Sequence, residues 1–172
     1  LLMIEHWDHT LPLLQGEGEV GCSDAHLFIE FPAYDSEDEQ KEQALLAGII
    51  QSDYIILASQ RLYGTIPRLP ERYPMTTRYY QLLMSGDLGY QLVYYPSRYP
   101  NLAGISLLDD PFASVPLVVP EALARERNRK GVLVLGRADE SYSVYDHPAT
   151  LIFEKREDLS LRELRELFGE TL

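Results

Sequence analysis

The sequence lacks the features that most readily assign a function. Its single cysteine, Cys22, excludes an intramolecular disulfide and any CxxC zinc or redox site. Neither a Walker loop nor a GxGxxG turn is present, which disfavours nucleotide binding by the usual devices. No apolar run approaches the roughly 18 residues that a membrane-spanning helix needs. The chain opens on four apolar residues with no initiator methionine and no signal peptide, so we expect it to be a piece of a longer protein.

Basic residues are scarce. Of 172 residues, 27 are acidic and 15 are basic, and the net charge of −12 excludes a general nucleic-acid binder. A hydrophobic fraction of 45% suits a single globular domain over residues 1–172. The charge is uneven, because residues 61–78 hold four arginines and only one acid. These arginines could offer forked donors to a phosphate or carboxylate, or they could pair with the acids nearby.

The spacing of apolar residues predicts alternating strands and helices. Residues 37–51 are predicted to form a helix, because Ser36 and Glu39 make a capping box ahead of an apolar face. The apolar run 54–58 is typical of a strand buried on both faces. Ser160 and Glu163 make a second capping box before a closing helix that ends at Gly169. Further strands are predicted at 1–4, 27–31, 89–95, 132–135, 142–145 and 149–153, and further helices at 76–85, ended by Gly86, and at 120–130.

These elements predict an α/β fold, with a mostly parallel sheet and flanking helices in a Rossmann-like three-layer arrangement. The strand–helix–strand order over residues 27–58 implies a parallel crossover. The C-terminal strands could add an antiparallel edge to this sheet. Residues 96–140 contain five prolines within their first 25 positions. We interpret this segment as an irregular insertion within the domain.

A polar cluster follows the first predicted strand, at the kind of strand end that commonly holds ligands. His6, Asp8 and His9 could hold a divalent metal together with a residue of the later Asp-His pair. The alternative is hydrogen-bonded loop packing, and because no recognised ligand spacing accompanies the cluster we predict no metal and no cofactor. The candidate polar loop comprises Glu5, His6, Trp7, Asp8, Asp146 and His147.

Tyrosine is abundant, with 12 residues in the chain, eight of which fall between positions 63 and 99. Its ring suits stacking on sugars or a place at a membrane interface, and the alternative is a tyrosine-rich core with satisfied hydroxyl groups. No residue is predicted to be catalytic, because Ser59 lacks the flanking residues of a nucleophile elbow. The candidate substrate-binding residues are Arg61, Tyr63, Arg68, Arg72, Tyr73, Arg78, Tyr79 and Tyr80.

Several segments of the chain resemble one group of membrane proteins. These segments are 5–8, 11–13, 53–54, 57–64, 66–74, 76–80, 145–148 and 151–153. They resemble the C-terminal soluble region of large multi-pass bacterial glycosyltransferases similar to the dolichyl-phosphate-mannose protein mannosyltransferases. They also resemble related tyrosine-rich membrane proteins of Chloroflexi and archaea. The run 58–80 is the specific core of this resemblance, and residues 96–138 take no part in it.

The resemblance implies a soluble domain on the extracytoplasmic face, attached after the last transmembrane helix. In such enzymes the catalytic carboxylate belongs to the transmembrane part, so this domain would serve recognition or assembly and would not transfer sugar alone. Its partners would be the transmembrane portion of the same polypeptide and a lipid-linked sugar on polyprenyl phosphate, or a glycan acceptor. Two alternatives stay open, namely an independent soluble metal-dependent α/β enzyme and a non-catalytic interaction module.

Overall fold

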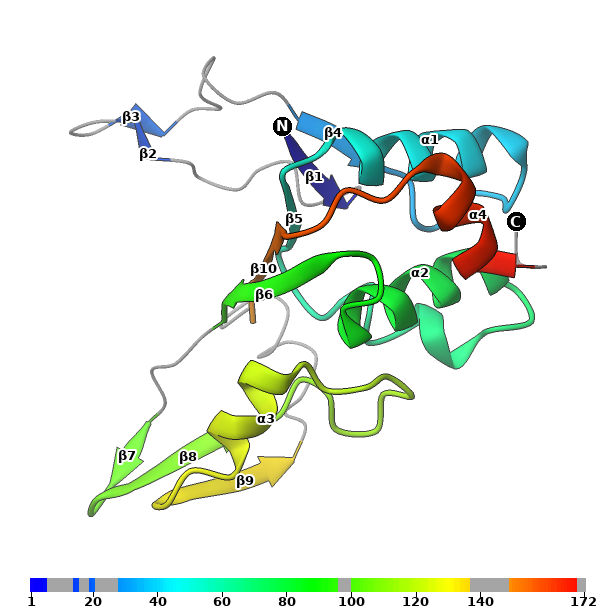
Figure 1. The fold of residues 1–172 in the computed structure, drawn as a ribbon. Coiled ribbons are helices and arrows are strands. Elements are labelled where there is room, and N and C mark those ends of the chain that lie inside the picture. The colour runs from blue at the N-terminus through cyan, green and yellow to red at the C-terminus, as the bar shows by residue number, and fades with distance from the viewer. Residues whose placement is uncertain (6–13, 16–18, 21–27, 96–99, 137–148, 170–172) are drawn as a thin grey trace.

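The centre of the molecule is a five-stranded mixed sheet, shown by a computed structural model that describes residues 1–5, 14–15, 19–20, 28–95, 100–136 and 149–169 (Figure 1). The strand order is β4-β1-β5-β10-β6. β1 pairs in parallel with β4 and β5, whereas β10 runs antiparallel to both β5 and β6. The strands are β4 (Phe28–Phe31), β1 (Leu2–Glu5), β5 (Tyr54–Leu57), β10 (Leu151–Lys155) and β6 (Tyr90–Tyr94).

This arrangement confirms the α/β class, but the sheet is only partly parallel where a mostly parallel one was predicted, and the antiparallel strand does not lie at its edge. β10 lies between β5 and β6, and β6 forms the edge. The sequence of β10 explains its position, because Leu151 and Phe153 are buried against the helices while Ile152 packs on the opposite face. A strand that is apolar on both faces is typical of the interior of a sheet.

Three helices pack on one face of this sheet. They are α1 (Glu39–Gln51), α2 (Pro74–Ser85) and α4 (Leu161–Phe168), and all three contribute side chains to the same hydrophobic cluster as the strands (Figure 1). The opposite face of the sheet presents a smaller buried cluster of Leu2, Ile4 and Ile56. Among the described residues, no helix packs on that second face, so the described part of the chain has two layers.

The ends of these helices follow local sequence signals in two of three cases. Ser160 and Glu163 form the predicted capping box of α4, and Gly86 ends α2 with a φ of 89°, a conformation that favours glycine. The cap of α1 differs, because Asp38 and not Ser36 accepts the hydrogen bond from the backbone N–H of Lys41. Within the described ranges, no helix has the length and apolar character needed to cross a bilayer.

Residues 101–136 form a second, smaller sheet that the sequence does not predict in full. Its strands are β7 (Asn101–Leu102), β8 (Ile105–Asp109) and β9 (Val132–Gly136), and α3 (Glu121–Arg127) connects β8 to β9. Phe112 stacks on Tyr63 with ring centroids 5.5 Å apart, which ties this unit to the main core. The structure also describes a short hairpin of β2 (Leu14–Gln15) and β3 (Glu19–Val20). The predicted strand 142–145 lies outside the described residues.

Candidate functional site

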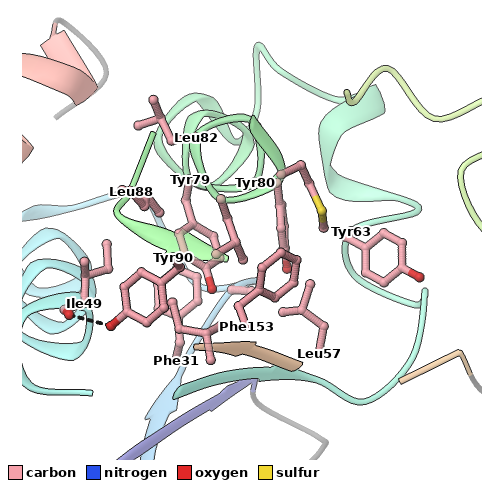
Figure 2. Packing of buried hydrophobic residues seen from close by; sticks show 14 of the residues in the cluster. Phe31, Ile49, Leu57, Tyr63, Tyr79, Tyr80, Leu82, Leu88, Tyr90 and Phe153 are labelled. Atoms are coloured by element: carbon pink, nitrogen blue, oxygen red, sulfur yellow. Dashed lines mark hydrogen bonds between the residues drawn. The ribbon is translucent and has the colours of Figure 1, made fainter. Parts of the chain in front are cut away.

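The arginine and tyrosine segment is a loop at the carboxyl end of β5, continued by the 3-10 helix η1 (Ile66–Arg68) and by α2. Its four candidate tyrosines are all buried: Tyr63, Tyr79 and Tyr80 are fully enclosed, and Tyr73 is nearly so. Figure 2 shows Tyr79 and Tyr80 pointing from α2 toward the sheet. The structure therefore places these rings in the core, where they present no face to a sugar at the surface.

Of the four candidate arginines, Arg78 serves the fold through its side chain. Arg78 donates from Nε and Nη2 to the carbonyl oxygen of Leu167, at 3.0 and 2.9 Å, and so binds α2 to the C-terminal end of α4. A cation at that end of a helix is favourable, because the last carbonyl groups carry a partial negative charge. Arg61 is half-buried, and its backbone N–H donates to Ser59 Oγ at 3.3 Å.

The other two arginines are exposed. Arg68 ends η1 and Arg72 follows four residues later, and neither forms an ion pair with any residue that the structure describes. The Arg72 guanidinium lies 5.2 Å from the ring centroid of Tyr73, a cation–π contact that orients the side chain without neutralising it. In a chain with a net charge of −12, two cations that face solvent and have no carboxylate partner among the described residues are available for an external anion.

The loop that carries these arginines is fixed by backbone hydrogen bonds and by buried residues at both ends. The backbone N–H groups of Arg68 and Arg72 donate to the carbonyl oxygens of Thr65 and Leu69, at 3.1 and 3.0 Å. Ile66 and Tyr73, at either end of the exposed stretch, are buried in the main core. A loop anchored at both ends loses little freedom when it binds, so its donors are pre-organised for a ligand.

A network missed by the sequence analysis fixes the start of α2. Glu37 accepts hydrogen bonds from the backbone N–H groups of Met75 and Thr76, at 2.5 and 3.0 Å, and from Thr76 Oγ1 at 2.6 Å. The buried Lys41 ammonium donates to Glu37 at 3.2 Å and to the carbonyl oxygen of Ala33 at 2.8 Å. Burial lowers the pKa of Lys41, and the Glu37 carboxylate opposes that shift. No short-range pattern signals this contact, because Glu37 and Thr76 are 39 residues apart.

A second polar group is buried below the carboxyl ends of β1 and β5. Glu5, the last residue of β1, is enclosed and accepts a hydrogen bond from the hydroxyl group of Tyr80. Burial, and then the nearby Glu5 carboxylate, raise the pKa of Tyr79 well above its usual value. Gln60 is also enclosed, and its amide makes no hydrogen bond with the residues that the structure describes. These groups form polar interior and are closed to solvent.

The rest of the candidate polar loop cannot be placed. Of its six members, only Glu5 is described, and His6, Trp7, Asp8, Asp146 and His147 lie outside the described residues, as does His9. The described chain resumes at residue 149. Thr150 Oγ1 donates to the carbonyl oxygen of Ala58 at 3.0 Å, at the end of the sheet where the parallel strands β1 and β5 both finish. Within the described ranges, no three His, Cys, Asp or Glu side chains are grouped to hold a metal ion.

A surface depression of 460 Å³ lies at the opposite end of the sheet, where β5 begins. Its lining mixes both signs of charge, with Asp53 and Glu154 beside Lys155 and Arg156. Arg156 pairs with Glu154 at 2.6 Å, and the cations of the depression therefore have carboxylate partners of their own. This depression lies at the amino end of β5, whereas the exposed arginines lie on the loop beyond its carboxyl end.

No protein-family model, curated protein or solved structure matches this chain. A functional proposal must therefore rest on the chemistry of the described residues. The exposed Arg68 and Arg72 are the feature of the candidate substrate-binding segment that stays open to solvent.

Proposed function

We propose that this chain is a non-catalytic accessory domain of a membrane glycosyltransferase that uses polyprenyl-phosphate sugars, and that it lies on the extracytoplasmic face. In this proposal, Arg68 and Arg72 bind the phosphate group of the lipid-linked sugar. The supporting observation is that both guanidinium groups are exposed, on an anchored loop, without an ion-pair partner among the described residues.

The chemistry of the two side chains fits a phosphate group. Each guanidinium carries a permanent charge and a planar fork of N–H donors that matches the spacing of phosphate oxygens. A lipid-linked sugar offers one such anion at the junction of its polyprenyl chain and its sugar. A chain with a net charge of −12 repels anions from most of its surface, which favours the locally positive arginine loop as the approach for the headgroup.

The fold expected of this domain also belongs to the proposal. We propose a Rossmann-like arrangement on the basis of the parallel order β4-β1-β5 and of the crossover through α1 that joins β4 to β5, and the described residues supply two of its three layers. The transmembrane portion of the same polypeptide would be the second partner. The metal-dependent alternative draws most of its ligands from residues that are not described, and no observation favours it.

Binding of geranyl phosphate, a short polyprenyl phosphate, tests the proposal. The wild-type chain should bind geranyl phosphate and not geraniol, as measured by calorimetry. Loss of both guanidinium groups in Arg68→Gln/Arg72→Gln should weaken binding by at least about tenfold, because one charge-assisted hydrogen bond contributes roughly 1.5–3 kcal/mol.

The matched control is Arg162→Gln on α4, which removes an exposed arginine that is already paired with Glu166. This variant should bind geranyl phosphate as the wild type does. Equal affinity of the wild type and the double variant, or no binding by the wild type, would refute the assignment of the arginine loop.

A further inference from the structure

The outer face of the small sheet is apolar and exposed. Leu102 of β7 pairs with Ile105 of β8, and Leu107 pairs with Leu133 of β9, so these side chains share one face of the sheet. Their exposure is high: 70% for Leu102, 48% for Ile105, 51% for Leu133 and 62% for Leu135. Side chains of this size in adjoining positions make a contiguous apolar surface, which in a water-exposed protein marks a contact with a partner or a membrane.

Cations lie next to this apolar face. Residues 125–130, at the end of α3 and the turn into β9, hold four bases and one acid. Three of these bases already have carboxylate partners: Arg127 pairs with the buried Asp110 at 2.8 Å, Arg129 pairs with Glu126 at 3.1 Å, and Arg125 pairs with Glu121. Lys130 is exposed and forms no ion pair with any described residue. This is the second stretch, after residues 61–78, where the acidic chain becomes locally positive.

The apolar turn and the cationic turn lie at the same end of the small sheet. The backbone N–H of Ser106 donates to the carbonyl oxygen of Gly131 at 2.7 Å, which joins the start of β8 to the turn before β9. A Cβ atom at Gly131 would lie 3.5 Å from the carbonyl oxygen of Gly104, in the β7–β8 turn. Figure 1 shows both turns at one tip of the molecule. We call this end, residues 101–106 and 128–133, the sheet tip.

We propose that the sheet tip docks on the surface of an anionic lipid bilayer. Leu102 and Ile105 enter the boundary between headgroups and acyl chains, and Lys130 lies at the level of the lipid phosphates. Exposed apolar residues flanked by cations are the combination that binds an interface, because burial of apolar area and attraction to anionic lipid act together.

Charge decides between a bilayer and a second copy of the chain. Two copies meeting through the sheet tip would bring two positive turns together, and each copy carries a net charge of −12 that repels the other at longer range. An anionic bilayer attracts the sheet tip and repels the remaining acidic surface. The bilayer therefore both binds the chain and orients it with the small sheet facing the membrane.

This inference goes beyond the binding of a lipid-linked sugar and uses none of the same residues. Vesicles that lack polyprenyl phosphate test it alone, so its failure and the failure of the arginine loop can be told apart. We expect the wild-type chain to float with vesicles of phosphatidylcholine and phosphatidylglycerol, more weakly with phosphatidylcholine alone, and less as salt is added.

Three variants locate the contact, with circular dichroism as the check that each is folded. Leu102→Asp should abolish flotation, because it puts a charge on the most exposed large apolar side chain of the sheet tip. Lys130→Ala should reduce partitioning about fivefold, the effect expected from one cation near an anionic surface. Leu161→Asp, at an exposed leucine that begins α4, is the matched control and should leave flotation unchanged.

Two results would overturn the proposal. One is flotation that persists in Leu102→Asp, or that is absent in the wild type. The other is a concentration-dependent dimer, measured by sedimentation without vesicles, that Leu102→Asp dissociates, because the apolar face would then be a contact between copies of the chain.

Discussion

The hydrogen bonds of Glu37 make the sharpest prediction about stability. This one carboxylate caps the first turn of α2 and also neutralises the buried ammonium of Lys41, whose side chain is 3% exposed. The residue at the N-cap of α2, Tyr73, provides no side-chain hydrogen bond of its own. Glu37→Ala therefore removes the cap of one helix and leaves a charge uncompensated beside another.

The expected cost follows from these two losses. Removal of a helix cap costs about 1 kcal/mol, and breaking a buried ion pair by deleting one partner costs roughly 3–5 kcal/mol. The two losses overlap, since Lys41 also donates to two backbone carbonyl groups, so we expect about 4 kcal/mol in total. For a domain of this size, that lowers the melting temperature by roughly 8–16 °C.

Urea unfolding followed by circular dichroism measures this free energy directly. Glu39→Ala, in the exposed first turn of α1, is the matched control and should cost less than about 1 kcal/mol. A double variant, Glu37→Gln/Lys41→Met, should be more stable than Glu37→Gln alone, because it removes the stranded charge. If Glu37→Ala and Glu39→Ala lower the free energy of unfolding by the same amount, the hydrogen bonds of Glu37 do not stabilise the start of α2.

Three further predictions test other contacts. The hydroxyl group of Tyr90 donates to two backbone carbonyl groups, and burial raises the pKa of this phenol. In alkaline solution the folded phenol therefore stays neutral at a pH where the unfolded one has ionised. The free energy of unfolding should then fall as the pH rises above about 10. Tyr90→Phe should be less stable at neutral pH and lose stability less steeply in alkaline urea titrations. Gly64→Ala should cost about 1–3 kcal/mol by urea unfolding, because its Cβ would lie 2.4 Å from the carbonyl oxygen of Gln60. Arg78→Ala should lower the melting temperature and Arg78→Lys should restore part of it, because each loses bonds to the Leu167 carbonyl to a different degree.

Local signals predicted most of the main sheet and its helices. Apolar runs and capping residues are short-range patterns, and β5, α1 and α4 lie within a few residues of their expected bounds. The predicted position of β10 at the edge of the sheet was wrong, because the order of strands depends on contacts between residues that are far apart in the sequence. β7 and β8 were missed because prolines and glycines surround short strands, and the sequence pattern of that region is typical of irregular structure.

The candidate site could be predicted in composition but not in accessibility. Arginine and tyrosine are both amphipathic, so a segment rich in both is compatible with a core, a ligand site or both together. The fold divides the segment: α2 turns Tyr79 and Tyr80 into the sheet, and the loop before it leaves Arg68 and Arg72 in solvent. Helical geometry explains part of this division, because the buried side of α2 is unusually wide, and two successive tyrosines fit within it.

This division has a consequence for the function of the loop. The buried tyrosines fill the main core, to which both ends of the loop are anchored, with rigid rings that have few rotatable bonds, and Tyr63 stacks on Phe112 of the small-sheet segment. Substitution of these rings would then weaken anion binding only by loosening the loop, and the loss should scale with the loss of stability. Substitution of Arg68 should weaken anion binding at unchanged stability. Comparing the two effects across the same set of variants separates a ligand-binding role of the arginines from a structural role of the tyrosines.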